Sequence, residues 1–131
     1  MIEFFEPFEL PSVTHNSLNA VMRGNRPAII KSAKLRDAER AWEARLAKHK
    51  PKTPLTGALA ITVVFCYLND KQAGQPKATK PDLDNLEKVL FDCLERLEFF
   101  DIGDQQIAHK KVSKAFDKVQ GAYVKIEEIA R

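Results

Sequence analysis

The chain has 131 residues and a mass of 14.8 kDa, with 44% hydrophobic and 30% charged residues, which fits one globular domain with its own core and excludes a disordered chain. Its net charge of +3 at pH 7 and pI near 8.9 permit a nucleic-acid partner without requiring one. The N-terminal segment carries Glu3, Glu6 and Glu9 instead of a basic, apolar leader, and no apolar run is long enough to span a bilayer, so we expect a cytoplasmic protein without membrane segments.

An edge strand and a basic loop are expected at the N-terminal end of the chain. Residues 2–10 have the composition of a strand, but Pro7 restricts that strand to the edge of a sheet or to a bend. The following stretch, residues 11–31, is rich in Asn, Gly and Pro and contains Arg23 and Arg26. This composition is typical of a polar, basic loop.

A helix, a long strand and a second basic loop follow in the middle of the chain. Ser32 is a suitable N-cap for a helix whose apolar residues repeat at helical spacing until Pro51. Residues 55–68 are rich in β-branched and aromatic side chains with little amphipathic contrast, which predicts a central strand covered on both faces. Residues 71–81 contain no acidic side chain and fit a flexible loop that either simply connects two elements or grips a substrate.

The C-terminal half is expected to contain a second helix and two further strands. Residues 84–97 place apolar side chains on one helical stripe, and Gly103 marks the turn after that helix. Residues 106–116 and 122–129 have strand composition around a polar bend and are expected to pair as a hairpin. The order β-α-β-α-β-β predicts a single α+β domain over residues 1–131, with a small mixed sheet and two main helices packed on it.

Two carboxylates separated by one residue mark the start of the second helix, in the sequence KPDLDNLEK. Side chains at positions i and i+2 of an extended segment point the same way, so Asp82 and Asp84 can present their oxygens to one point. Because like charges repel, a divalent ion, a basic side chain or the positive end of the helix must compensate them. From these residues alone, the pair fits either a metal site or a helix cap beside a solvated aspartate.

A third carboxylate follows the helix at Asp104, with Asp101 close by in the sequence. If the strand that begins near Gln106 lies beside the central strand, we expect Asp104 to approach the Asp82–Asp84 pair, so that three carboxylates surround one point. A bound Mg²⁺ or Mn²⁺ would keep all three ionised, and a ligand set made only of oxygens favours these ions over zinc.

Lys88 follows Asp84 by one helical turn on the same face of the second helix. It fits an ordinary ion pair between neighbouring turns, or a cation beside a metal site that neutralises a phosphate in the transition state. Carboxylates, a divalent ion and a lysine are together the groups that phosphodiester hydrolysis requires. The sequence contains no EF-hand, phosphate-binding loop or serine-nucleophile motif.

These residues carry a resemblance to a known family. The stretch DLDNLEKVLFDCLE, followed by DQQI and a lysine-bearing strand, resembles the RusA family of Holliday junction resolvases, which bacterial chromosomes, prophages and phages encode. The resemblance implies a Mg²⁺-dependent homodimer that binds four-way DNA junctions and nicks two opposed strands, in recombination and repair. It also implies that the catalytic metal ligands are Asp82, Asp84 and Asp104, that Lys88 is a catalytic lysine and that Asn85 supports the site. Asp101 is a further supporting residue and the alternative to Asp104 as the third ligand.

Basic residues flank the acidic motif on both sides and form the electrostatic footprint expected for DNA. The side chains expected to contact DNA are Arg23, Arg26, Lys71, Lys77, Lys80, Lys110, Lys111 and Lys114. Two alternatives remain open from the sequence. The chain fits a metal-dependent nuclease for other branched DNA, or a DNA-binding module without catalysis whose aspartates cap the helix and pair with Lys80 and Lys88.

Overall fold

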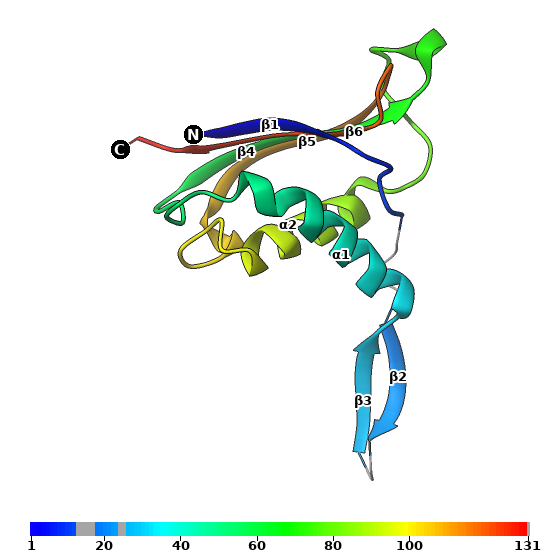
Figure 1. The fold of residues 1–131 in the computed structure, drawn as a ribbon, viewed down its shortest axis with the longest axis vertical. Helices are drawn as coiled ribbons and strands as arrows, with labels where there is room; N and C mark the ends of the chain where they lie inside the picture. Colours follow the sequence, from blue (N-terminus) through cyan, green and yellow to red (C-terminus); the bar gives the residue numbers. More distant parts are fainter. Residues whose placement is uncertain (13–17, 24–25, 131) are drawn as a thin grey trace.

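The computed structural model describes residues 1–12, 18–23 and 26–130 and has a four-stranded sheet with both long helices on one face (Figure 1). In order across the sheet, the strands are β1 (Ile2–Pro7), β6 (Gly121–Glu128), β4 (Leu59–Leu68) and β5 (Ile107–Asp117). β4 pairs parallel with β5 and antiparallel with β6, and β6 pairs antiparallel with β1. The expected α+β domain with a small mixed sheet is confirmed.

Both predicted helices are present, close to their expected bounds. α1 (Ala33–Leu46) begins after Ser32, whose hydroxyl oxygen accepts a hydrogen bond from the Leu35 backbone N–H at 3.1 Å. α2 (Leu83–Arg96) is amphipathic, and its apolar side chains are buried with those of α1 and β4 in one core. Among the described residues, no helix is long and apolar enough to cross a membrane. Short 3₁₀ helices lie at η1 (Ala47–His49), η2 (Asp70–Gln72) and η3 (Asp104–Gln106).

β4 is the inner strand of the sheet that its composition predicts, but helices cover only one of its faces. On the face that carries the helices, its buried side chains are Leu59, Ile61, Val63 and Phe65. On the opposite face, its half-buried side chains are Ala60, Thr62 and Val64. The expectation of a strand covered on both faces is therefore wrong, because α1 and α2 pack on the same side (Figure 1).

β5 and β6 do not form the hairpin that the sequence suggested. β4 lies between them, parallel to one and antiparallel to the other. The connection through residues 118–120 passes the end of β4, where the Asn69 backbone N–H donates to the Asp117 carbonyl at 2.9 Å. A strand as apolar as β4 is stabilised by a hydrogen-bonded neighbour on each edge, and this arrangement provides both.

The basic segment between β1 and α1 contains a two-stranded sheet where a loop was expected. β2 (Leu18–Arg23) and β3 (Arg26–Lys31) pair antiparallel, with Arg23 opposite Arg26. Figure 1 shows this hairpin projecting away from the main sheet and the helices. The expectation of a loop is wrong for these two strands, and the signal that could have predicted them is Gly24-Asn25, a typical two-residue hairpin turn between strand-like runs.

The basic segment before α2 is more regular than the flexible loop that was expected. After η2, its backbone pairs with the outer edge of β5: the Phe116 N–H donates to the Gln75 carbonyl at 2.9 Å, and the Lys77 N–H donates to the Lys114 carbonyl at 3.1 Å. These bonds cover part of an otherwise open sheet edge. They also hold the stretch of chain that leads into α2.

Candidate active site

The two carboxylates of the acidic motif lie at the N-terminal end of α2, as the sequence predicts. Asp82 occupies the N-cap position with an extended backbone, and Asp84 lies in the first turn. An aspartate at this position commonly accepts a hydrogen bond from a backbone N–H of the first turn. The Asp82 side chain makes no such bond, and both carboxylates are exposed to solvent. Their charges therefore stand at the positive end of the helix, open to a ligand.

Asp104 lies at the other end of the same helix. It begins η3, and its backbone N–H donates to the Glu95 Oε1 atom near the C-terminus of α2 at 2.9 Å. A helix rises about 1.5 Å per residue, so Asp84 and Glu95 are about 16 Å apart along the axis. Figure 1 shows the turn after α2 at the opposite end of the helix from its start.

The three carboxylates are therefore not gathered at one point, as the sequence led us to expect. Within the described ranges, no group of three or more Asp, Glu, His or Cys side chains is close enough to hold a metal ion. The strand that follows Asp104, β5, does lie beside the central strand β4 as expected, and the two are parallel. However, a crossover helix between parallel strands leaves one strand at one end of the sheet and returns at the other. Asp104 thus follows the C-terminal end of α2, whereas the Asp82–Asp84 pair lies at its N-terminal end.

Lys88 lies between these two acidic positions. Its ammonium pairs with Asp92 Oδ1 at 3.0 Å, and not with Asp84, which was one of the two interpretations left open by the sequence. The hydrogen bond that the Lys88 ammonium donates to Asp92 raises the pKa of Lys88 above its ordinary value of 10.5, and the charges of Asp104 and Glu95 raise this pKa further. Lys88 is therefore an exposed, protonated lysine in the field of Asp104. The sequence contained the signal for Asp92, which is one helical turn after Lys88.

Gln106 folds the turn that carries Asp104. Its buried Oε1 atom accepts hydrogen bonds from two backbone N–H groups of the turn, at 2.7 and 3.0 Å. Its Nε2 atom donates to two backbone carbonyls just before β4, at 3.2 and 3.0 Å. The sequence marked Gln106 only as part of a motif, whereas the structure assigns it a structural role that local sequence does not reveal.

The two supporting residues are also divided between the ends of α2. Asn85 is half-buried in the first turn of the helix, beside Asp84. Asp101 lies in the turn after the helix with an exposed side chain, and its backbone N–H donates to the Leu55 carbonyl at 3.0 Å. Of the two aspartates in this turn, Asp104 is the one whose charge acts on Lys88.

The lysines of β5 point to different faces of the sheet. Lys110 and Lys114 lie opposite buried residues of β4 that face the helices, whereas Lys111 lies opposite Thr62, on the other face. Lys110 pairs with Glu87 of α2, with 2.7 Å between Nζ and Oε1. Lys114 donates to backbone carbonyls in the segment before Asp82. Two of these three predicted DNA contacts thus have partners within the chain.

Lys77 is also held by the protein. Its ammonium lies 5.2 Å from the ring centre of Tyr67 and 5.3 Å from that of Phe116, and it donates to Thr79 Oγ1 at 2.6 Å. Cation–π contacts of this kind keep a lysine against the protein surface. Lys77 is therefore half-buried on the segment that precedes the acidic motif.

The other basic residues expected to contact DNA lie on three parts of the chain: the segment between β4 and α2, the strand β5, and the β2–β3 hairpin. Lys71, Lys80 and Lys111 are exposed, and none forms an ion pair within the described part of the chain. Arg23 and Arg26 are paired positions where β2 ends and β3 begins. The structure does not describe their side chains. The predicted DNA contacts are therefore distributed over the β2–β3 hairpin, β5 and the segment before α2.

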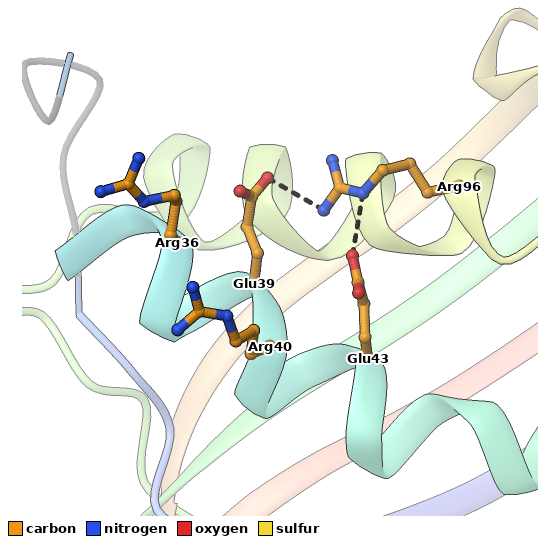
Figure 2. Close-up of a pocket in the computed structure, with 5 residues that line it drawn as sticks. All are labelled: Arg36, Glu39, Arg40, Glu43 and Arg96. Carbon is orange, nitrogen blue, oxygen red and sulfur yellow. Dashed lines mark hydrogen bonds and ion pairs between the residues drawn. The ribbon is translucent and has the colours of Figure 1, made fainter. Parts of the chain in front are cut away.

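A separate open pocket of ≈ 190 Å³ lies between α1 and α2. Figure 2 shows the Arg96 guanidinium between two carboxylates of α1, 2.9 Å from Glu39 and 2.8 Å from Glu43. The other lining residues are Arg36 and Arg40. The ion pairs of Arg96 with Glu39 and Glu43 connect α2 to α1 at this pocket. None of the residues that line it belongs to the acidic motif.

Two comparisons with known proteins cover these elements. The sequence model of a family described as "Endodeoxyribonuclease RusA" matches residues 11–127. The protein named "Crossover junction endodeoxyribonuclease rusA" of Lactococcus phage r1t is 32% identical over 93 residues, which cover 66% of this chain and 69% of the phage protein. The family match includes both ends of α2, with Asp82, Asp84 and Asp104.

Proposed function

The chain belongs to the RusA family of endodeoxyribonucleases, and from this premise we propose that it resolves four-way DNA junctions by paired nicks in recombination and repair. It is an endodeoxyribonuclease, so the reaction is hydrolysis of a DNA phosphodiester, and branched DNA is its substrate. We place this activity in the cytoplasm and its gene in a phage or prophage, in line with its phage relative. The observation that carries the proposal is the Asp82–Asp84 pair, which lies within the family match, is exposed to solvent and makes no capping hydrogen bond through Asp82.

The Asp82–Asp84 pair fits a hard divalent cation. Its donors are carboxylate oxygens, both side chains are exposed, and neither a capping bond nor a lysine of α2 occupies them. Nucleases of this family depend on a metal ion, and we propose Mg²⁺, with Mn²⁺ as a substitute, held by this pair. When bound, such an ion polarises the phosphate and lowers the pKa of a water molecule.

Lys88 supplies positive charge to the reacting phosphate. It lies one helical turn from Asp84, and its raised pKa keeps it protonated at neutral pH. An ammonium in this place offsets the charge that develops on phosphate oxygens in the transition state. Asp92 orients this ammonium in the free protein through the 3.0 Å ion pair.

The position of Asp104 supports a shared site in a homodimer. Asp104 and the Asp82–Asp84 pair lie at opposite ends of α2, which leaves the pair with few protein ligands for an ion. We propose that two copies associate so that Asp104 of one copy completes the ligand set around the pair of the other. Two such sites in one dimer also account for paired nicks on opposed strands.

Incubation with synthetic four-way, three-way and linear DNA, with and without Mg²⁺, tests the function. We expect Mg²⁺-dependent nicking of the four-way junction at symmetric positions, and no cleavage of linear DNA. Cleavage of three-way DNA alone would favour a nuclease for other branched structures. Junction binding with no cleavage of any substrate would overturn the proposal and favour the DNA-binding module.

Co-expression of Asp82→Asn and Asp104→Asn chains with different tags tests the shared site. In a mixed dimer, one shared site would keep all of its aspartates and the other would lack two. We therefore expect purified mixed dimers to nick one strand, although each variant alone is inactive. Inactive mixed dimers beside active wild-type protein would show that each site is completed within one chain.

A further inference from the structure

Lys114 of β5 holds the backbone that immediately precedes the acidic motif. Its Nζ atom donates to the Pro81 carbonyl oxygen at 2.6 Å and also to the Thr79 carbonyl oxygen. Pro81 is bonded to Asp82, so one lysine ammonium connects the edge strand to the entry of α2. The lysine and its two acceptors are more than thirty residues apart in the sequence, so only the folded chain brings them together.

The same segment is held at further points. The Lys77 backbone N–H donates to the Lys114 carbonyl at 3.1 Å, and the Lys77 ammonium donates to the Thr79 hydroxyl at 2.6 Å. On the helix side, the Asp82 carbonyl accepts the first hydrogen bond of α2, from the Leu86 N–H at 3.2 Å. Asp82 therefore lies between two fixed stretches of backbone, and Lys114 provides the bonds on the upstream side.

The engagement of Lys114 argues against its direct use as a phosphate contact. A lysine ammonium has three donors, and two of them already point to carbonyl oxygens of the protein. The Lys114 side chain is half-buried, whereas Lys111 on the same strand is exposed and points to the other face of the sheet. To bind DNA, Lys114 would have to release the segment that carries Asp82.

We propose that Lys114 is a positioning residue for Asp82 rather than the DNA contact that its charge suggested. By fixing the Pro81 carbonyl, it sets the direction in which Asp82 presents its carboxylate beside Asp84. This inference rests on the proposed metal-dependent nuclease function. Groups that orient metal ligands without touching the metal typically change metal affinity by about 10-fold to 100-fold when they are removed.

The test compares Lys114→Met with Lys111→Met as a matched control from the same strand. We expect Lys114→Met to weaken Mn²⁺ binding by about 10-fold in calorimetry without DNA, and to raise the Mg²⁺ concentration for half-maximal cleavage by a similar factor. Junction affinity in EDTA should stay within about twofold of wild type, because no phosphate contact is lost. Lys111→Met should leave Mn²⁺ affinity without DNA unchanged, and Lys114→Arg, which keeps the donors, should restore part of the metal affinity.

The outcomes separate this inference from the proposed function. Lower junction affinity in EDTA with unchanged Mn²⁺ binding would make Lys114 a DNA contact and overturn the inference. Wild-type values in every assay would overturn it as well. If Lys114→Met does not fold, Lys114→Gln, which retains a donor, is measured by the same assays against the same criteria. If the wild-type protein binds Mn²⁺ but cleaves no branched DNA, the proposed function fails while the positioning role is still judged by Mn²⁺ affinity.

Discussion

The chain contains acidic residues in two opposite environments. Glu6 on β1 has 4% of its side chain exposed, and the Lys48 ammonium and the His49 ring lie 2.7 and 2.9 Å from its oxygens. Asp82 and Asp84 are exposed at the start of α2, and the first of them does not cap the helix. The first environment surrounds a carboxylate with partners, whereas the second exposes two carboxylates to solvent.

This difference separates an acidic residue that stabilises the fold from acidic residues that can bind a ligand. A buried carboxylate is tolerated only when charged or polar partners surround it, so Glu6 fixes β1 to η1 at the end of α1. Asp82 and Asp84 are exposed to water at the N-terminal end of α2, so both carboxylates are accessible to a cation. Removal of Glu6 should therefore affect stability, and removal of either aspartate should affect activity.

The largest expected effect is on catalysis. Asp82→Asn or Asp84→Asn should lower the rate of junction cleavage by about 10³-fold, since metal-assisted charge stabilisation is worth several kcal/mol. Both variants should keep their free energy of unfolding within about 0.5 kcal/mol of wild type, because these side chains are exposed. Single-turnover cleavage and urea unfolding measure the two effects. Full cleavage by either variant would contradict the assignment of that aspartate.

The opposite pattern is expected for Glu6. Glu6→Ala removes the shared partner of Lys48 and His49 and should lower the free energy of unfolding by about 1–3 kcal/mol. Glu9→Ala, an exposed site near the same strand, is the matched control and should change it by less than about 0.5 kcal/mol. Urea unfolding monitored by circular dichroism makes the comparison. Unchanged stability of Glu6→Ala, or a lower cleavage rate per folded molecule, would contradict the assignment of Glu6 to stability and not to activity.

The pH dependence of stability sharpens the role of Glu6. Burial raises the pKa of its carboxyl, but the hydrogen bonds and charges of His49 and Lys48 outweigh burial, so the pKa lies below its ordinary value of 4.5. A lowered folded-state pKa stabilises the protein above the unfolded value, and this stability is lost as pH falls through the folded pKa. Relative to Glu6→Gln, which does not titrate, wild-type protein should therefore lose its advantage between about pH 5 and the acid range. A difference that stays constant in urea unfolding from pH 7 to 3 would contradict the lowered pKa.

Arg96 is paired, as Glu6 is, but it is partly exposed, so its removal should have a smaller effect on stability than removal of Glu6. It pairs with Glu39 and Glu43 across the two helices, but 40% of its side chain is exposed, so solvent screens the pairs (Figure 2). Arg96→Met should lower the free energy of unfolding by about 1 kcal/mol or less, with a smaller loss at high salt. Arg40→Met, which removes an exposed pair with Asp37, is the control. Thermal unfolding at low and high salt measures both, and a large, salt-independent loss for Arg96→Met would place it with Glu6.

Features that depend on neighbouring residues could be predicted from the sequence. Ser32 caps α1 as expected, and the apolar spacing that begins at Leu86 predicts α2 within a residue of its bounds. The expected hairpin of β5 and β6 was wrong because strand pairing depends on which edges of β4 are open, and this is a property of the whole sheet. Gly24-Asn25 could have predicted the β2–β3 hairpin, but together with the other Asn, Gly and Pro residues of the segment it was interpreted as part of a loop.

The α+β class, the two helices and the position of Asp82 and Asp84 at a helix start could be predicted from the amino-acid order, because caps and helical periodicity are local properties. Two features are seen only in the folded chain: Asp104 follows the far end of α2, and Lys114 bonds to the backbone before Asp82. The physical reason is the crossover between parallel strands. It places the loops before and after α2 at opposite ends of the sheet, which no local pattern records.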